Sequence, residues 1–349
     1  MGPSGQRTGT LCLVPSGALI FASHEACLRH DPGGGHPEQA GRLGAVVAGL
    51  AGARAAEAVV RVTPRAATRE ELLRVHTAEH LDALEGFCRT GGGPIDDDTA
   101  AGPGSWDAAL VAAGAGPDLV ARLRSGEADT AFVAVRPPGH HATPRRSMGF
   151  CLLNNVAVTA ASLASEGERV LIVDIDAHHG NGTQDVFYRD PRVAYLSLHE
   201  WPLYPGTGWL DQRGAGEGEG TTVNIPLPSG ATGDVYLRAV EQVVEPLAGR
   251  FRPTWLLVSA GFDAHRADPL TGLSLSAGDF AVLVAELVPL VPPGRVIALL
   301  EGGYDLAALE SSTAATVDAL LGVRHFPEPP TTGGPGVEMV SAARRSGSP

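Results

Sequence analysis

Five apolar runs of strand length end abruptly at polar residues. They are "TAFVAV" before Arg136, "RVLIVDI" before Asp176, "RVAYLSL" before His199, "TWLLVSAGF" before Asp263 and "GRVIALLEGG" before Tyr304. Their apolar residues are nearly continuous rather than alternating, which is typical of strands buried on both faces of a parallel sheet. Ala-rich segments of helical character, such as 155–166 and 236–248, lie between them. The pattern therefore predicts an α/β fold with a central parallel β-sheet flanked by helices.

The most polar of these strand ends is "DIDAHHGNGT", residues 174–183, in which two acids and two histidines lie within six residues. Charged groups near a buried strand are costly unless they are paired or bind an ion. In sheets of this kind, ligands bind beyond the carboxyl ends of the strands, where loops from separate strands converge. We therefore expect the active site at this edge of the sheet.

A chain of 349 residues is long enough for one large α/β domain with a substantial core. We expect residues 1–326 to form this domain. The segment 327–349 mixes Pro, Gly and Ser without apolar periodicity, and we expect it to be a disordered tail.

Composition argues against several classes of function. The net charge is −13 and the chain contains no lysine, so that every basic residue is an arginine; this disfavours direct binding of nucleic acid. No apolar run approaches the roughly 20 residues that cross a bilayer, and the first residues lack the features of a secretory signal. We expect a cytoplasmic protein with no membrane partner, and the sequence leaves its oligomeric state open. The cysteines are scattered and are expected to be reduced thiols: Cys12, Cys27, Cys88 and Cys151.

Asp176, His178 and Asp263 are candidate metal ligands. A two-residue spacing in an extended segment puts Asp176 and His178 on the same side of the chain, and Asp263 could join them from a neighbouring strand end. One imidazole and two carboxylates suit zinc and leave a position open for water or substrate. Ferrous iron tolerates the same ligands. The spacing also fits a polar pair at a strand end beside an unrelated surface aspartate.

His140, His141 and Tyr304 are candidate catalytic residues. The histidines follow "RPPG", a rigid turn that would fix their direction, and they could act as general acid and base near a metal. Gly302 lies two residues before Tyr304, and its lack of a side chain allows the backbone to approach a bound substrate. The phenol of Tyr304 could donate a hydrogen bond to a developing oxyanion. Considered separately, each motif also has a purely structural explanation. The two histidines could simply lie in a turn, and the tyrosine could simply pack at the edge of the sheet.

Further segments join these in one ordered series: "HDPGGGHPEQAGRL", "DDDTAAGPGSWDAALVAAGA", "RPPGHHA", "GFCLLNN", "DIDAHHGNGT", "SLHEWPLYPGTG", "SAGFDAHRADPLTGL" and "LEGGYDL". In this order they resemble the motifs of the zinc-dependent histone deacetylase family, and most closely those of its class II and bacterial amidohydrolase members. The similarity extends over residues 19–321. It implies the single-domain arginase–deacetylase fold, with the active site at the carboxyl ends of the strands.

The resemblance implies a catalytic role for each of the polar residues. In the family a water attacks the amide carbonyl, which the metal and a tyrosine polarise, and one histidine removes a proton from the water and later protonates the leaving amine. That histidine corresponds to His141, held by Asn181 where some relatives carry Asp. The other histidine gives electrostatic support and corresponds to His140, with Asp174 behind it. The tyrosine corresponds to Tyr304, and the zinc ligands correspond to Asp176, His178 and Asp263.

Two further sets of positions follow from the resemblance. The walls of the family's acyl-lysine tunnel correspond to Phe150 and Tyr204, a tunnel backbone position to Gly149, and a rim carboxylate that holds the substrate backbone to Asp98. The family also carries a structural or regulatory potassium ion near the zinc, whose ligands correspond to Asp174, Asp176, His178, Ser197 and Leu198. A second, outlying potassium site would use carbonyls near Phe187, Asp190, Val193 and Thr221.

These parts predict a zinc-dependent deacetylase that converts N-acetyl-lysine in a protein or peptide to acetate and a free amine. An acetylpolyamine or other small-molecule amidohydrolase is the nearest alternative, although Leu270 stands where polyamine-selective relatives carry a gatekeeper Glu. A non-catalytic acyl-lysine binding protein is more distant, because every predicted ligand and Tyr304 are present. An arginase-like ureohydrolase needs two manganese ions and D-x-H-x-D runs, which the order Asp174-x-Asp176-x-His178 does not match.

One loop departs from the family pattern. After "GHHA" many relatives carry acidic residues, whereas this chain has Thr143-Pro144-Arg145-Arg146. If this loop borders the tunnel mouth, the two arginines favour an acidic substrate or disfavour a basic, histone-like tail. Two solvated loop arginines fit the sequence equally well.

Overall fold

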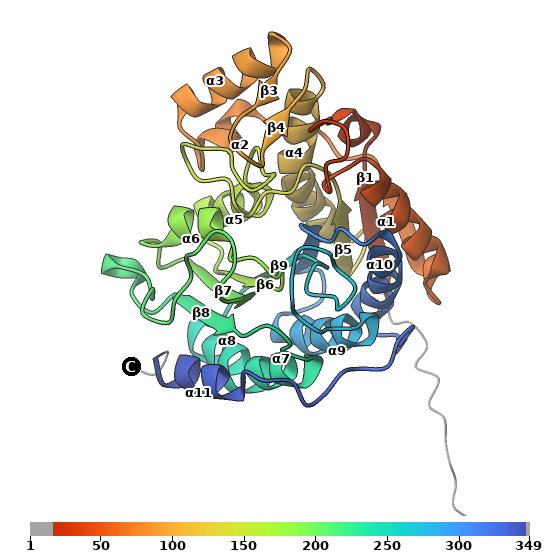
Figure 1. Ribbon diagram of the computed structural model, residues 1–349, viewed down its shortest axis with the longest axis vertical. Coiled ribbons are helices and arrows are strands. Elements are labelled where there is room, and N and C mark those ends of the chain that lie inside the picture. Colours follow the sequence, from red (N-terminus) through yellow and green to blue (C-terminus); the bar gives the residue numbers. More distant parts are fainter. Residues whose placement is uncertain (1–16, 347–349) are drawn as a thin grey trace, which may run out of the picture.

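An eight-stranded parallel β-sheet forms the centre of the computed structural model, which describes residues 17–346 (Figure 1). Its strands are β1 Leu19–Ser23, β2 Val59–Val62, β5 Thr130–Ala134, β6 Val170–Asp174, β7 Val193–Glu200, β8 Thr222–Leu227, β9 Trp255–Ala260 and β10 Val296–Leu300. They follow the order β2-β1-β5-β10-β9-β6-β7-β8, and every neighbouring pair is parallel. The predicted α/β fold class is confirmed.

Helices cover both faces of the sheet (Figure 1). They are α1 Gly41–Gly52, α2 Arg69–Leu73, α3 Ala78–Arg89, α4 Ser105–Arg124, α5 Asn155–Ser165, α6 Asn181–Phe187, α7 Gly233–Ala239, α8 Glu245–Phe251, α9 Ala277–Leu287, α10 Leu306–Leu320 and α11 Val337–Ser346. One layer is a continuous series in which α1 contacts α10, α10 contacts α9 and α9 contacts α7, and the other is built around α4 and α5, which contact each other. The helix predicted at 236–248 divides into α7, a π-helical turn and α8.

The five apolar runs of the sequence correspond to β5, β6, β7, β9 and β10, in which every residue is buried. The same pattern did not identify β1, β2 or β8. β2 is a short edge strand with half-exposed residues, and β8, the other edge strand, contains Asn224 and Pro226. Proline is tolerated there because one side of an edge strand has no partner to which an N–H would donate. The two edge strands thus lack the continuous apolar signal of central ones, whereas β1 is an interior strand with a buried apolar run that the prediction overlooked.

The C-terminal segment differs from the prediction of a disordered tail, because the structure folds residues 327–346 against the domain. Thr331 donates from its backbone N and its hydroxyl to Asp279 at 3.0 and 2.8 Å. Helix α11 then contacts β8 and α7 and buries Val340 completely. The Pro- and Gly-rich stretch is held by backbone hydrogen bonds and by one short apolar stripe, neither of which composition reveals.

The cysteines within residues 17–346 are free and buried: Cys27, Cys88 and Cys151. Cys12 lies outside the described residues. Burial raises the pKa of the Cys27 thiol to about 11 and that of Cys151 well above its usual range. Since the thiolate is the reactive form, these thiols are poor nucleophiles and the chemistry lies elsewhere.

Candidate functional site

The loops that follow β6, β9 and β10 emerge side by side at the carboxyl edge of the sheet. Asp174, the last residue of β6, is in register with Ser259 on β9, and Ala260 on β9 is in register with Leu300 on β10. Chain segments 175–183, 261–272 and 301–305 therefore begin next to one another, although they are far apart in the sequence. This is the edge at which the sequence predicted a site.

Asp176, His178 and Asp263 come together beyond this edge. Their ligand atoms all lie within 4.8 Å of one another. The Nδ1 atom of His178 is 3.2 Å from Oδ1 of Asp176 and 3.0 Å from Oδ2 of Asp263. Both carboxylates are fully buried. This geometry rules out a solvated surface role for Asp263.

Backbone amides orient both carboxylates. The N–H of Ala177 donates to Oδ1 of Asp263 at 2.7 Å, and the N–H of Gly302 donates to Oδ2 of Asp176 at 2.8 Å. A Cβ atom on Gly302 would lie 2.3 Å from Asp263 and 2.7 Å from Asp176. Only glycine therefore lets the strand-end backbone reach these two side chains. Such supporting contacts are typical of metal ligands held in a fixed orientation.

The electrostatics of the three residues favour a bound cation. Burial and the charge of Asp176 raise the pKa of Asp263 to about 7. Burial also opposes ionisation of Asp176, but His140 and His178 outweigh it and hold the pKa of Asp176 well below its usual range. Two buried carboxylates this close repel each other unless positive charge lies between them. One imidazole and two carboxylates that converge from separate loops fit a divalent metal.

His140 lies between two carboxylates. Its Nδ1 is 3.0 Å from Oδ2 of Asp174, and its Nε2 is 3.7 Å from Oδ1 of Asp176. Burial alone would lower the pKa of His140, yet the charges of Asp176 and Asp174 outweigh burial and raise this pKa to about 10. The hydroxyl of Tyr195 donates to the same oxygen of Asp174 at 3.0 Å. His140 is therefore a cation at neutral pH.

His141 has the opposite electrostatic character. Its Nδ1 lies 2.8 Å from Oδ1 of Asn181, which can only accept, so Nδ1 carries the proton and Nε2 is left with its lone pair. Burial and the neighbouring charges of His140 and His178 place the pKa of His141 well below its usual range. The two ring centroids of the histidine pair are 4.0 Å apart. A neutral imidazole beside a cationic one suits a general base.

Tyr304 lies between the end of β10 and the start of α10, directly after Gly302 and Gly303. Its backbone N–H donates to Asp268 at 2.8 Å, and the guanidinium of Arg42 stacks over its ring at 5.0 Å from the centroid. Arg42 also donates from Nε to the carbonyl of Gly303 at 2.7 Å. Burial raises the pKa of the Tyr304 phenol well above its usual range. The phenol therefore keeps its proton and remains a hydrogen-bond donor.

Phe150 and Tyr204 contact two of the candidate catalytic side chains, Tyr304 and His141. The Phe150 ring meets Tyr304 edge-on with 5.7 Å between centroids, and Tyr204 meets His141 edge-on at 5.2 Å. Phe150 has a φ of +67°, which is unfavourable for a residue with a bulky side chain. Its N–H donates to the hydroxyl of Thr99 at 3.1 Å. A strained aromatic residue that is held this firmly indicates a wall whose orientation matters.

The remaining predicted substrate positions lie around these walls. Gly149 has a φ of +57°, and a Cβ there would lie 2.5 Å from the His141 ring. Asp98 accepts from the hydroxyl of Thr99 at 2.8 Å and is partly buried. Leu270 is 37% exposed, two residues beyond Asp268. The structure thus brings Gly149 and Asp98 to the walls and leaves Leu270 at the surface.

The predicted potassium ligands fall into two groups. Asp174 and Ser197 are in register across β6 and β7, next to Leu198, and Asp174 is two residues from the candidate metal ligand Asp176. The second group surrounds the amino end of β7, where Val193 donates to the carbonyl of Asp190 at 3.4 Å. The carbonyl of Thr221 already accepts from Tyr195 at 2.9 Å, and Phe187 ends α6. Potassium binding at either place stays a prediction.

Sequence reasoning missed a buried carboxylate behind the histidines. Glu301 is fully buried and its Oε2 accepts from the N–H groups of Gly139 and His140 at 2.7 and 3.1 Å. Burial raises its pKa to about 7. The residue holds the "RPPGHH" turn against β10. The sequence feature that could have identified Glu301 was its position directly before Gly302 in "LEGGYDL".

A second missed feature is the buried ion cluster of Glu38, Arg42 and Arg136, all with fully buried side chains. Glu38 accepts from Nη1 of Arg42 at 3.1 Å and from Nη2 of Arg136 at 2.6 Å. His30 lies 3.3 Å from the same carboxylate. The cluster fixes Arg42, and through it the ring of Tyr304.

The Glu38→Gln variant should therefore be strongly destabilised. It leaves two buried guanidinium groups without their shared counter-charge, which typically costs about 3–5 kcal/mol. Urea denaturation measures the free energy of unfolding, and Glu286→Gln, at an exposed position near the end of α9, is the matched control. A loss below about 1 kcal/mol for Glu38→Gln would show that the cluster does not need its charge.

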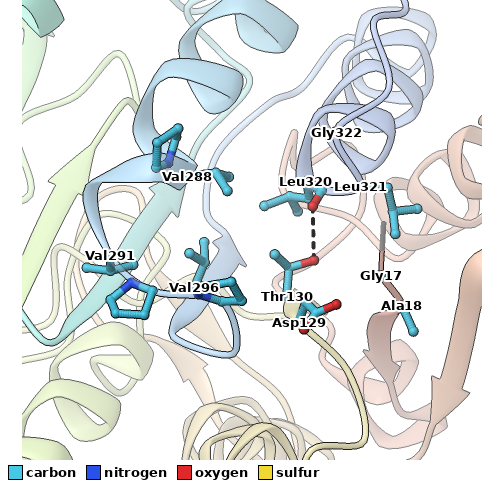
Figure 2. Close-up of a pocket in the computed structure, with 13 residues that line it drawn as sticks. Gly17, Ala18, Asp129, Thr130, Val288, Val291, Val296, Leu320, Leu321 and Gly322 are labelled. Atoms are coloured by element: carbon cyan, nitrogen blue, oxygen red, sulfur yellow. Dashed lines mark hydrogen bonds between the residues drawn. The ribbon is translucent and has the colours of Figure 1, made fainter. Parts of the chain in front are cut away.

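A separate hollow of about 450 Å³ opens at the amino ends of β1, β5 and β10 (Figure 2). Valine, leucine and proline side chains make up most of its lining, and Thr130 donates across it to the carbonyl of Leu320 at 3.2 Å. Asp129 is the one ionisable residue of its lining within residues 17–346. The hollow lies at the opposite end of the sheet from the polar residues and lacks their chemistry.

Comparisons with known proteins agree with this geometry. The family model described as Histone deacetylase domain matches residues 36–320. A "Probable deacetylase" of Archaeoglobus fulgidus is 41% identical over 87% of this chain and 86% of its own length. The histone deacetylase-like amidohydrolase of Pseudomonas aeruginosa is 38% identical over 74% of this chain and 70% of its own.

Histone deacetylase 15 of Arabidopsis thaliana is 41% identical, but the chain spans only 56% of its length. The crystal structure of the HDA15 HD domain superposes with a TM-score of 0.87 at 36% identity, covering 94% of this chain and 95% of that one. Among residues 17–346, none of the helices has both the length and the apolar character needed to cross a membrane.

Proposed function

Because the chain belongs to the histone deacetylase family of hydrolases, we propose that it is a zinc-dependent deacetylase acting on N-acetyl-lysine in proteins or peptides. One observation carries the proposal: the three convergent ligands lie together with the histidine pair beyond the sheet edge, and Tyr304 follows Gly302, whose N–H donates to Asp176. Their chemistry is that of metal-assisted amide hydrolysis. The products are acetate and the free lysine amine.

Each group of residues at the site has a separate role in the proposed reaction. A divalent cation held by Asp176, His178 and Asp263 supplies Lewis-acid polarisation of the amide carbonyl when bound. His141 accepts the proton of the attacking water at Nε2, because Asn181 holds its other nitrogen protonated, and later gives the proton to the leaving amine. The Tyr304 hydroxyl donates to the carbonyl oxygen as negative charge develops there.

The surroundings support these steps. His140, a cation between Asp174 and Asp176, adds positive potential beside the forming oxyanion. Phe150 and Tyr204 keep water away from the reacting amide and contact the lysine methylenes. In this setting of low polarity, each hydrogen bond to the oxyanion is worth more than in water.

The decisive experiment measures acetate release by the zinc-reconstituted protein from acetyl-lysine peptides and from acetylated polyamines. Because the chain contains no lysine, any acetyl-lysine signal in mass spectrometry belongs to the substrate. Turnover of peptides supports the proposal. Turnover of polyamines alone would transfer the function to small-molecule metabolism, and stoichiometric peptide binding without acetate release would indicate a binding protein. Repeating the assay with ferrous iron under anaerobic conditions compares the two candidate metals.

A further inference from the structure

A groove of about 380 Å³ lies between α3 and the turn 143–147. Its apolar lining comes from Leu84 and Phe87 on α3 and from Ile95, which follows the short strand β3 Gly93–Pro94. Its polar lining includes His80 and the arginines of the turn. The groove thus combines an apolar floor with a cationic rim.

The turn that carries the arginines is firmly held. The N–H of Thr143 donates to the carbonyl of Arg146 at 2.9 Å, and the N–H of Thr77 donates to the carbonyl of Pro144 at 2.9 Å. His76 donates from Nδ1 to the carbonyl of Thr143 at 3.0 Å, since its Nε2 accepts from Asn154. The arginine side chains therefore project from a fixed backbone rather than from a mobile loop.

The two arginines of the turn are not equivalent. Arg146 pairs with Asp96, with 3.5 Å between Nη2 and Oδ2. Arg145 is exposed, lines the groove and has no carboxylate within ion-pairing distance among residues 17–346. From the sequence, both arginines were given the same expected role. In the structure, Arg145 is the one whose charge is available to bind a ligand.

Two short chain segments connect the lining of the groove with the predicted tunnel wall Phe150: residues 147–150 and the turn 95–99. Ile95 donates from its N–H to the carbonyl of Thr99 at 2.7 Å, and the Thr99 hydroxyl accepts from the N–H of Phe150. Asp98, the predicted rim carboxylate, lies between Ile95 and Thr99 in this turn. An acyl-lysine side chain between the aromatic walls would therefore leave its neighbours in the peptide within reach of the groove.

We infer that this groove is a subsite for a glutamate side chain next to acetyl-lysine in the peptide substrate, with Arg145 as its specificity residue. The methylene groups of glutamate contact Leu84, Phe87 and Ile95, and its carboxylate pairs with the Arg145 guanidinium. The inference rests on the proposed function and adds to it the class of peptide that is preferred.

The charge of the whole protein acts in the opposite direction. The net charge of −13 and the acids Asp96, Asp97 and Asp98 attract basic peptides at long range. At about 0.1 M salt, however, charges more than about 10 Å apart are largely screened. Discrimination at the groove then depends on the charged side chains that line it, Arg145 and Arg146, of which Arg146 is already paired with Asp96.

The test uses acetyl-lysine peptides that are identical except for Glu, Gln or Lys at the residue on either side of acetyl-lysine. Values of kcat/KM are measured at about 0.1 M salt for the zinc-loaded wild type, Arg145→Ala and Arg145→Glu. We expect the wild type to prefer Glu over Gln by roughly three- to fivefold on one side, as suits an ion pair that is partly exposed. Arg145→Ala should bring this ratio close to one, and Arg145→Glu should invert the preference between Glu and Lys.

Arg61→Ala is the matched control, because Arg61 is an exposed arginine on the edge strand β2 and is not part of the lining of the groove. It removes the same charge and should keep the preference of the wild type. Equal Glu-to-Gln ratios in the wild type and Arg145→Ala, with peptides still turned over, would overturn the subsite alone. Failure to deacetylate any peptide would overturn both the subsite and the proposed substrate class.

Discussion

The Tyr304→Phe variant is expected to lose about 10²- to 10³-fold in kcat, the usual effect of removing one donor to a developing oxyanion. The change deletes a single oxygen atom. The ring keeps its contacts with Arg42 and Phe150, and the backbone N–H keeps its bond to Asp268. Thermal stability and metal content should therefore stay those of the wild type, while KM changes little.

This effect is large because the phenol is held as a donor before the substrate arrives. Burial keeps its pKa well above the usual range, so the proton is present at every working pH. Because the ring is fixed, no reorganisation is needed as the charge forms. Steady-state acetate release from one acetyl-lysine peptide gives kcat and KM, and metal analysis of the same sample excludes loss of the ion.

Tyr188→Phe is the matched control, because Tyr188 lies just beyond α6 and outside the candidate site. It removes a phenol elsewhere and should leave kcat unchanged. A loss of less than about tenfold in Tyr304→Phe would mean that the metal alone stabilises the oxyanion. A fall in melting temperature similar to the fall in activity would point to a packing role instead.

The Asp263→Asn variant should bind metal far more weakly than the wild type and release no measurable acetate. Loss of a hydrogen bond that only supports a ligand costs about 10- to 100-fold in metal affinity, and loss of a ligand should exceed this. Metal affinity is measured by competition with a chelator. Asp185→Asn, an exposed acid on α6, serves as control.

Without metal, the same variant should be at least as stable as the wild type. Burial and Asp176 raise the pKa of Asp263 to about 7, above the unfolded value of about 3.9. Asp263 therefore contributes a fall in the stability of the metal-free wild type as pH rises from about 4 towards 7, because the unfolded chain loses a proton that the folded chain retains. The asparagine variant lacks this contribution, so its stability should fall less over the same range. Unchanged metal affinity, or equal pH dependence of the two metal-free proteins, would contradict the role of Asp263.

Much of the fold could be read from hydrophobic pattern because the central strands are buried on both faces. β5, β6, β7, β9 and β10 each have an unbroken apolar run followed by polar residues. The edge strands β2 and β8 and the segment 327–346 did not carry this signal. These segments are held in place by contacts with residues that are distant in the chain, such as the hydrogen bonds that Thr331 donates to Asp279.

By itself, the sequence determined the residue types of the site and their places at strand ends, because a parallel sheet brings those ends to one edge. The order of the motifs identified the family, which the comparisons confirm. It could not reveal the contacts between side chains far apart in the chain. Only the tertiary structure showed that Glu38 links two buried arginines and that Glu301 holds the histidine turn. It also showed that Arg146 pairs with Asp96, whereas Arg145 has no carboxylate partner in the part of the chain that the structure describes. Each depends on distances of a few ångströms between segments that local pattern treats as independent.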